Sequence, residues 1–533
     1  MPSRPDPDSL VELQNEIETF LRSLAHPTLC EDDTELLDLT EHHWRVSVEF
    51  GKLVFEAWSP GRSLARRVEA IAYRDRGRLG VFVRKPGAHS TTALEFRDQA
   101  DRGRPRPDDA ADAVGAPPRD RAGYRKALAA MIEREFPGRR PERVANRSDR
   151  EFSFSAWYTR GWARQGRTAW AFLGLAEGEP VAAADSVLAF GLIWLDWLRA
   201  HAPDTIVSGL KLFLPPAAIE TIAHRAAYLN PRAASVEIFE WKWDGALDPS
   251  TAGKPLLIDL KDYGNVQTRL TPRHQREQLV ERHATLLPDL LGDLAERLNV
   301  VPDARSNAVS LRVLGLEVAR IEGDLAPRVT FGLEGSARRL VEGDPVSRDQ
   351  LLTFLRRALA VRRARSDDPS DELYRLQGER WLESLLVRDI TRIDPALAPE
   401  CVYPQVPAFA GFDRGVIDIL SVARDPQYGN RLAVIELKVQ EEINLPLQGL
   451  DYWLRVKWLL ERRQFQEFGY FPGVELSPAP PLLYLVSPAF RFHSTTGQLI
   501  RYLDPAIDVV QVGINQQWRS GVKVLFRRAA RGN

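Results

Sequence analysis

Two extended apolar stretches in the last third of the chain each carry one carboxylate, Asp418 within residues 415–420 and Glu436 within residues 432–438. An ionised carboxylate in a buried strand must be paired or bound to a metal, because removing it from water without compensation costs much free energy. Side chains two residues apart on a strand point to the same face, so Glu436 and Lys438 share a side. Turn-forming residues between the stretches predict adjacent antiparallel strands, on which the three side chains meet.

This set of groups suits metal-dependent hydrolysis of a phosphodiester. The two carboxylates and the backbone carbonyl of Leu437 offer the hard oxygen ligands that Mg²⁺ or Mn²⁺ takes in proteins. Such a metal polarises a bound phosphate, and Lys438 would orient or help to deprotonate the attacking water. A structural alternative is that Asp418 is a strand-end residue bonded to a backbone donor, and that Glu436 and Lys438 form an exposed salt bridge on an edge strand.

Two helical segments are expected to place further polar groups beside these strands. A proline opens a helical run in which Gln448 and Tyr452 lie four residues apart and therefore on one face. Upstream, residues 371–387 read as one amphipathic helix, with the acids Glu379 and Glu383 on the same side. Taken alone, Gln448 and Tyr452 favour the interpretation as ordinary helix-surface and core residues.

The order and spacing of these elements resemble the PD-(D/E)XK, or restriction-endonuclease-like, nuclease superfamily. Asp418 would fill the D position of its motif, and the residues from Glu436 to Lys438 would read as ExK. The proline that names the motif is absent, since Ile417 precedes Asp418. The resemblance covers residues 370–533 and implies a mixed sheet flanked by helices.

The flanking helices carry the resemblance further. Gln448 and Tyr452 are similar to the QxxxY element of the RecB-type and lambda-exonuclease-type branch, which implies that they contact the substrate. The superfamily also places a glutamate on its first helix, a role that falls to Glu383, with Glu379 as the second choice. The implied function is a Mg²⁺- or Mn²⁺-dependent DNA nuclease in DNA repair or in defence against foreign DNA. The alternative is a catalytically inactive nuclease fold that binds nucleic acid or a protein.

Composition constrains the rest of the chain. The 533 residues, of which 44% are hydrophobic and 27% charged, are typical of a multidomain globular protein. The 72 basic and 73 acidic residues balance, so bulk charge does not indicate a nucleic-acid partner. Two local basic clusters are candidate phosphate contacts or solvated faces. They consist of Arg455, Lys457, Arg462 and Arg463, and of Arg527, Arg528 and Arg531.

The cysteines and the apolar runs bear on location. Cys30 and Cys401 are the only cysteines, so neither a disulfide framework nor a cysteine zinc site is expected, which fits a reducing compartment. The N-terminus does not resemble a signal peptide, and no apolar run is long enough to span a bilayer. We therefore expect a cytoplasmic, bacterial protein with no membrane partner.

The fold class expected is α/β, or α+β, in several domains. Five segments are predicted: a helix and a mainly antiparallel sheet (1–97), a mobile linker rich in Pro, Asp, Arg and Ala (98–121), an α/β domain (122–270), a connecting region (271–369) and the nuclease-like domain (370–533). Residues 1–365 resemble no family. The N-terminal region is a candidate surface for a protein partner or an oligomer.

Two motifs in the middle of the chain have simpler explanations. The residues from Trp157 to Trp170 interleave aromatic and basic side chains, as a stacking platform for nucleic acid does, but a twisted hairpin with tryptophan in its core is favoured. Asp259 and Lys261 form a second DxK sequence. We interpret it as coincidental, because no QxxxY helix follows it.

Overall fold

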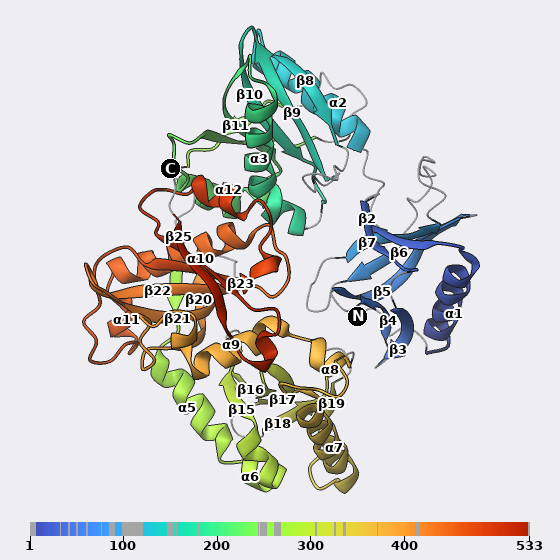
Figure 1. Cartoon of the computed structure of the whole chain (residues 1–533), viewed down its shortest axis with the longest axis vertical. Coiled ribbons are helices and arrows are strands. Elements are labelled where there is room, and N and C mark those ends of the chain that lie inside the picture. The colour runs from blue at the N-terminus through green and yellow to red at the C-terminus, as the bar shows by residue number, and fades with distance from the viewer. Residues whose placement is uncertain are drawn as a thin grey trace. The chain divides into compact units, whose positions relative to one another are not determined.

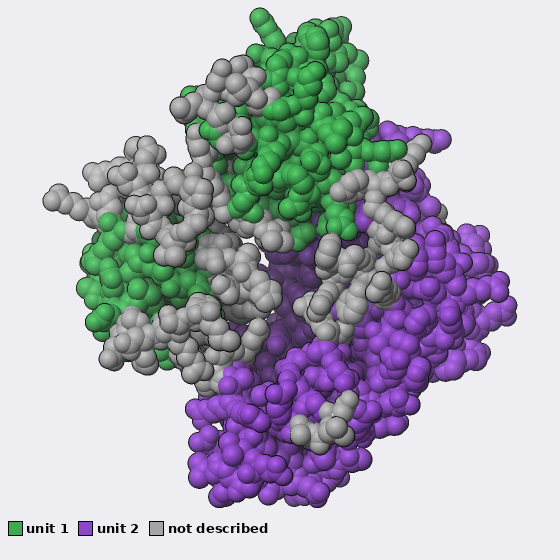
Figure 2. Space-filling view, turned by 180° about the vertical axis from the view of Figure 1, so that it is seen from behind, with its two compact units in different colours: residues 1–222, 235–259 green, residues 223–234, 260–533 purple. Residues whose placement is uncertain are grey.

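The structure is a computed structural model that divides into two compact units. It describes residues 7–530 except for 32–33, 41–42, 50–51, 60–61, 76, 85–90, 99–120, 147–153, 155–156, 180, 244, 246–252, 261–267, 304–305, 324–326, 334–336, 370 and 411–414. Unit 1 comprises residues 1–222 and 235–259, and unit 2 comprises residues 223–234 and 260–533 (Figure 2). The interior of the predicted linker, 99–120, lies outside the described residues.

The first sheet of unit 1 is a seven-stranded antiparallel sheet covered by one helix. Its order is β2-β1-β7-β6-β5-β4-β3. The bounds are α1 (Pro7–Ser23), β1 (Pro27–Glu31), β2 (Thr34–Asp38), β3 (His43–Glu49), β4 (Lys52–Ser59), β5 (Arg62–Asp75), β6 (Arg78–Arg84) and β7 (Thr91–Asp98). Ile17, Phe20 and Leu21 of α1 join the core with the inward side chains of the strands, such as Phe55 and Phe96. The predicted antiparallel sheet in this part of the chain is confirmed.

The second sheet of unit 1 is mixed, with order β13-β12-β11-β10-β9-β8. Its elements are α2 (Arg121–Glu135), β8 (Arg140–Ala145), β9 (Tyr158–Gln165), β10 (Thr168–Leu175), α3 (Val181–His201), β11 (Ile206–Leu214), β12 (Ser235–Glu240) and β13 (Leu256–Leu257), with η2 (Pro216–Ala218) and α4 (Ile219–Ala227) after β11. β9 and β10 form the hairpin that was favoured for the aromatic and basic stretch, and both Trp162 and Trp170 are buried. Buried rings are not free to stack on nucleic acid. Lys261 of the second DxK sequence lies outside the described residues.

Unit 2 begins with a five-stranded antiparallel meander between helices. The order is β15-β16-β17-β18-β19. The bounds are α5 (Arg273–Ala284), α6 (Leu287–Leu291), η4 (Gly292–Arg297), β15 (Asn299–Pro302), β16 (Ala308–Val313), β17 (Leu316–Glu322), β18 (Arg328–Phe331), β19 (Arg338–Arg339) and α7 (Pro345–Val361). Asp344 caps α7 by accepting hydrogen bonds from the backbone N–H groups of Val346 and Ser347. Leu351 and Leu355 of α7 pack into the core of this meander.

The C-terminal sheet is mixed, with order β14-β20-β21-β22-β23-β24-β25 (Figure 1). β22, β23 and β24 run parallel, and the other neighbours are antiparallel. The strands are β14 (Thr268–Leu270), β20 (Tyr403–Ala410), β21 (Val416–Asp425), β22 (Gly429–Leu437), β23 (Leu482–Pro488), β24 (Val509–Ile514) and β25 (Val524–Ala530). The helices are α8 (Glu372–Arg375), α9 (Gly378–Arg388), η5 (Ile390–Arg392), α10 (Leu445–Glu461), α11 (Gln464–Glu467), η6 (Ala489–Arg491), α12 (Thr496–Arg501) and η7 (Trp518–Ser520). The mixed α/β class is thus confirmed, and within the described residues no helix is both long and apolar enough to cross a membrane.

The two faces of this sheet carry different helices (Figure 1). Ile435 and Leu437 of β22 pack with Trp381 of α9, whereas Val434 and Glu436 alternate onto the face covered by α10. Gly449 allows α10 to approach β23 closely, because a Cβ at this position would lie only 2.8 Å from Leu485 Cδ2. The functional candidates therefore lie where the ends of β21 and β22 meet the two helices.

The single helix predicted over residues 371–387 is wrong: the chain breaks between α8 and α9. Gln377 adopts a left-handed backbone conformation with φ 48° and ψ 48°. The buried guanidinium of Arg362 donates hydrogen bonds to the carbonyls of Leu373, Leu376 and Gln377. These hydrogen bonds stabilise the break between α8 and α9, because they satisfy carbonyls that would accept backbone hydrogen bonds in a continuous helix. The amphipathic pattern alone carries no sign of this side chain from another element.

Candidate active site

Asp418 and Glu436 face each other across the β21–β22 hairpin. The paired residues end at Ile419 and Ile435, so Asp418 and Glu436 occupy the next opposite positions. The backbone N–H of Leu437 donates a hydrogen bond of 3.0 Å to Asp418 Oδ2. The predicted antiparallel arrangement is confirmed. One oxygen of Asp418 has the backbone donor that the structural alternative required, and the other oxygen faces Arg380.

Glu436 is buried in the middle of the sheet, not on an edge. β22 lies between β21 and β23, and Glu436 is 2% exposed. Lys438 Nζ donates to Glu436 Oε1 at 2.9 Å. Glu436 Oε2 is excluded from solvent and accepts no hydrogen bond from the described residues. The alternative of an exposed edge salt bridge is therefore wrong. Only one of the two carboxylate oxygens of Glu436 has a hydrogen-bond donor among the described residues.

The electrostatics of this pair follow from burial. Burial raises the pKa of Glu436; Lys438 opposes that rise and Asp418 adds to it, so the pKa reaches about 8. Burial alone would lower the pKa of Lys438, but the charges of Glu436, Glu379 and Asp418 outweigh it and the net change is upward. Lys438 therefore stays a cation at neutral pH, and Glu436 ionises with difficulty unless more positive charge arrives.

The first glutamate candidate, Glu383 of α9, is held from two sides. Gln405 of β20 donates to its Oε1 at 2.8 Å, and Arg380 donates to its Oε2 at 2.6 Å. Arg380 also reaches Asp418 Oδ1 at 3.4 Å, so one guanidinium bridges the two acids. Burial raises the pKa of Glu383, against the lowering effect of Arg380. Arg380 and the charge of Asp418 thus place Glu383 in the same cluster as Asp418.

Glu379, the second choice, lies one turn earlier on α9 and reaches a different partner. Its Oε2 is 3.8 Å from Lys438 Nζ. Burial raises its pKa, and Lys438 works against that rise. The two glutamates of α9 therefore have different neighbours: Glu383 lies near Asp418, and Glu379 lies near Lys438.

Helix α10 brings Tyr452 to the same face as the carboxylates. Burial raises the pKa of the Tyr452 hydroxyl, and the charges of Glu436 and Asp418 raise it further, so the group stays protonated. Gln448 precedes it by one turn, and its side-chain Oε1 is buried without a hydrogen bond to the described residues. An unsatisfied buried amide oxygen is costly, which is consistent with a group kept for a ligand.

Three side chains near the acids were not predicted from the sequence: Arg380, Gln405 and Arg312. Gln405 lies between the paired residues of β20 and β21, opposite Asp418, and its positive φ of 50° sets the direction of its side chain. Arg312 of β16 interacts electrostatically with Arg380 and Glu383. Gln405 and Arg312 come from strands far from α9 in sequence, so no local pattern could reveal them. Arg380 is three residues from Glu383 on α9, a spacing that the sequence does show, but its contact with Asp418 spans 38 residues.

Five of the seven basic residues singled out in the sequence make contacts within the protein. Arg455 is buried and donates to the carbonyl of Ala408, and Lys457 pairs with Glu461 on α10. The guanidinium of Arg462 stacks over the ring of Trp458, with 4.0 Å from Cζ to the ring centroid. In the C-terminal cluster, Arg527 pairs with Asp394 and Arg528 donates to Gln511, while Arg531 lies outside the described residues. These contacts favour structural roles over phosphate contacts.

The donor set fits a hard divalent cation. The described residues contain no group of three or more His, Cys, Asp or Glu side chains that could hold a metal ion by themselves. Mg²⁺ needs fewer, because it keeps several waters and takes substrate phosphate oxygens beside one or two carboxylates. The uncompensated Oε2 of Glu436 beside Asp418 is where such a charge would relieve the cost of burial. Asp418, Glu436 and the carbonyl of Leu437 would be its protein ligands.

Comparison with known proteins adds no relative to this picture. No protein-family model matches the chain, and a search of curated proteins finds no match. The predicted site residues Asp418, Glu436, Lys438 and Glu383 nevertheless lie together, with Glu379 and Tyr452 beside them.

Proposed function

We propose that residues 370–533 form a metal-dependent nuclease of the restriction-endonuclease-like kind, which hydrolyses phosphodiester bonds in DNA and serves DNA repair or defence against foreign DNA. The observation that carries the proposal is Glu436: buried, opposite Asp418, bonded to Lys438, and left with one oxygen unpartnered among the described residues. A structural ion pair would not need a second carboxylate at this point.

The residues of the chain have separate roles in this proposal. Mg²⁺ or Mn²⁺, when bound, would supply the positive charge that polarises the scissile phosphate. Lys438 keeps its proton and would orient the attacking water beside Glu436. Gln405 donates to Glu383, and Glu383 accepts from Arg380, which would hold a phosphate oxygen or Asp418 in place. Gln448 and Tyr452 would contact the DNA backbone.

A cleavage assay on the full chain tests the proposal. Linear duplex, circular duplex and single-stranded DNA are incubated with Mg²⁺, with Mn²⁺ or with EDTA. We expect metal-dependent cleavage that is lost in Asp418→Asn and in Glu436→Gln, because each substitution keeps the shape and removes a ligand charge. Glu400→Gln, an exposed acid paired with Arg424 in the same domain, should cleave as the wild type does. Undiminished cleavage by Asp418→Asn would refute the assignment of the site.

One observation favours the second candidate, an inactive fold that binds nucleic acid or a protein. Arg380 already neutralises Asp418 and Glu383, so the chain supplies a positive charge of its own where a metal ion would act. A Mn²⁺ titration of the wild type and of Arg380→Met separates the two candidates. A nuclease should bind Mn²⁺ in the wild type. If Mn²⁺ binds only after Arg380 is removed, the inactive binding fold is the better description.

A further inference from the structure

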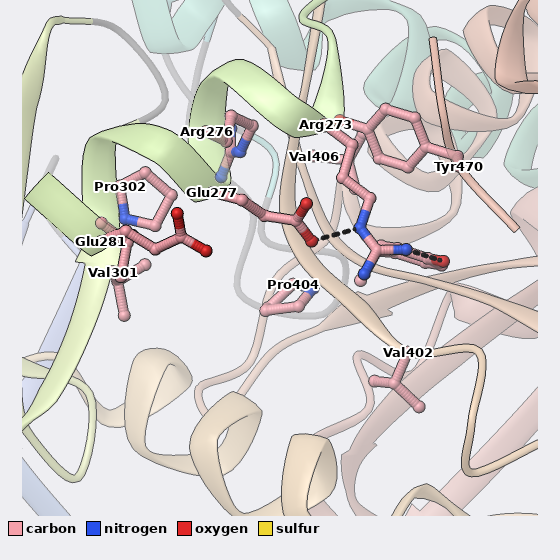
Figure 3. A pocket seen from close by; sticks show the side chains of 12 residues that line it. Arg273, Arg276, Glu277, Glu281, Val301, Pro302, Val402, Pro404, Val406 and Tyr470 are labelled. Atoms are coloured by element: carbon pink, nitrogen blue, oxygen red, sulfur yellow. Dashed lines mark hydrogen bonds and ion pairs between the residues drawn. The ribbon is translucent and has the colours of Figure 1, made fainter. Parts of the chain in front are cut away.

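A cavity of about 420 Å³ lies in unit 2 between α5, β15 and β20 (Figure 3). Its apolar walls come from all three elements: Val280, Val301, Pro302, Val402, Pro404 and Val406. Two tyrosines also line it: Tyr403 is half-buried and Tyr470 is buried behind it, with ring centroids 5.2 Å apart. None of these residues belongs to the candidate active site.

Two arginines of α5 line this cavity, and they differ in what holds them. Arg273 donates to Glu277 Oε1 at 2.6 Å and to the Tyr403 hydroxyl at 3.1 Å, and its guanidinium lies over the Tyr403 ring (Figure 3). Arg276 forms no ion pair with a carboxylate of the described residues, and its Nη1 is excluded from solvent without a hydrogen bond to them. Arg273 is therefore part of the cavity wall, whereas Arg276 Nη1 can donate a hydrogen bond to a ligand.

An uncompensated guanidinium among apolar walls is costly to the fold. Buried polar groups are nearly always hydrogen-bonded, and a buried charge without a partner is destabilising. Burial lowers the pKa of Arg276, and Tyr470 and Asp303, which act to raise it, do not offset the effect of burial. Glu281 also lines the cavity but is exposed, so water screens its charge. A ligand that brings one negative charge to Arg276 would remove this penalty.

The cavity and the candidate active site share strand β20. Pro404 and Val406 face the cavity, and Gln405 between them donates to Glu383. A ligand seated against Pro404 and Val406 would therefore press on the residue that orients the first-helix glutamate. The cavity wall on β20 is therefore only one residue away from Gln405, which holds Glu383 of the candidate active site.

We propose that this cavity binds a single nucleotide, with its phosphate on Arg276 and its base against the half-buried Tyr403 and the apolar wall. Arginine pairs strongly with phosphate oxygens, and bases stack on aromatic side chains. The single unpaired guanidinium matches one phosphate group. The nucleotide is either free or the 5′-phosphorylated end of a strand. The proposal goes beyond the nuclease function and does not depend on it, because the cavity residues and the metal-site residues are different.

Calorimetric titration of the full chain in EDTA tests the proposal. The probes are dAMP, deoxyadenosine, inorganic phosphate, and a single-stranded oligonucleotide with and without a 5′-phosphate. We expect dAMP to bind and deoxyadenosine to bind more weakly. Arg276→Met should weaken dAMP binding by about 10- to 100-fold, the loss of a charge-assisted hydrogen bond. Arg282→Met, an exposed arginine of the same helix outside the cavity, is the control. Preference for the 5′-phosphorylated oligonucleotide over dAMP identifies a strand end as the ligand, and the reverse identifies a free nucleotide.

A melting curve distinguishes a binding role of Arg276 from a structural one. Arg276→Met removes a half-buried guanidinium with one donor that has no partner among the described residues, so its Tm should equal or exceed that of the wild type while binding is lost. A lower Tm together with lost binding would overturn the proposal, as would dAMP affinity unchanged by the substitution or no binding of any probe. Asp418→Asn should bind dAMP like the wild type, so failure of the nuclease proposal and failure of this one give different results.

Discussion

At the scale of single residues, Lys438 connects the candidate metal ligands to the first helix. Its Nζ lies 2.9 Å from Glu436 and 3.8 Å from Glu379. We expect Lys438→Ala to bind Mn²⁺ as tightly as the wild type or slightly more tightly, because a neighbouring cation has gone. The cleavage rate should fall by about 10²–10⁴, the same range as for a positioned acid or base, because the attacking water loses the cation that orients it. Calorimetric Mn²⁺ titration and single-turnover cleavage measure the two effects separately.

The matched control for this substitution is Lys523→Ala, an exposed lysine in the same domain, which should change neither quantity. Wild-type turnover by Lys438→Ala would show that the lysine is only a salt-bridge partner of Glu436. A loss of Mn²⁺ binding equal to the loss of rate would instead place Lys438 in support of the metal ligands.

Glu436 predicts a pH dependence of stability in metal-free protein. Its pKa is raised in the fold to about 8, so between its ordinary value and pH 8 the folded protein holds a proton that the unfolded chain has lost. Stability therefore falls as pH rises through this window. Glu436→Gln should abolish this fall. Between pH 5 and pH 9 in EDTA, the free energy of unfolding of the variant should therefore rise by about a few kcal/mol relative to that of the wild type. Urea unfolding at several pH values checks this, and parallel curves for the two proteins would contradict it.

At the scale of elements, local patterns predicted the strands better than the helix. Residues 415–437 specify a hairpin by themselves, since two apolar runs and a turn lie within one stretch of chain, and Asp418 and Glu436 meet as expected. The break at Gln377 depends on Arg362, which comes from beyond the end of α7. Gln405 reaches Glu383 across 22 residues, and Arg380 reaches Asp418 across 38. Such contacts exist only once the elements pack, so the supporting half of the site could not be read from the sequence.

Helix α10 makes a prediction that separates binding from structure. Gln448→Ala with Tyr452→Phe should weaken cleavage of all DNA sequences alike, because contacts to phosphates position a substrate without reading its bases. Mn²⁺ binding should be unchanged, and so should Tm, since Gln448 Oε1 has no partner among the described residues to lose. Cleavage rates on substrates of different sequence, with melting curves beside them, test both points.

The control on α10 is Glu461→Gln, which lies at the exposed end of the helix. A fall in the Tm of the double variant that accounts fully for its lost activity would remove the QxxxY interpretation. The interpretation of Asp418, Glu436 and Lys438 would then stand without a substrate-binding helix.

At the scale of the whole molecule, the class of fold was predictable but the grouping of segments was not. The mixed α/β class followed from alternating helical and strand patterns. The compact units, however, place residues 223–234 with unit 2, where Arg225 forms a bidentate ion pair with Asp451. β14, only three residues long, joins β20 as the edge of the C-terminal sheet. Contacts between segments this far apart in sequence produce no change in amino-acid composition at a domain boundary, so the sequence does not reveal them.

Within unit 2, the β16–β17 hairpin packs directly on the first helix of the candidate site. Gly315 in its turn has φ 81°, and a Cβ there would lie 2.1 Å from the carbonyl oxygen of Arg380. Arg362, which is 2% exposed, donates to the carbonyl of Leu314 in the same turn as well as to three carbonyls before α9. The meander is thereby joined to the helix that carries Glu379, Arg380 and Glu383.

Arg362 therefore yields a prediction for the stability of unit 2 as a whole. Arg362→Met keeps an apolar stem but removes the guanidinium that lies over the Trp381 ring, and it leaves several buried carbonyls without a donor, each costing about 1–3 kcal/mol. We expect a loss of at least about 3 kcal/mol in the free energy of unfolding, together with weakened Mn²⁺ binding, because α9 loses its anchor. The neighbouring Arg363→Met removes only a surface pair with Asp367 and should cost less than about 1 kcal/mol. Urea unfolding followed by tryptophan fluorescence measures both variants, and equal losses in the two would show that the meander and the site are not coupled through Arg362.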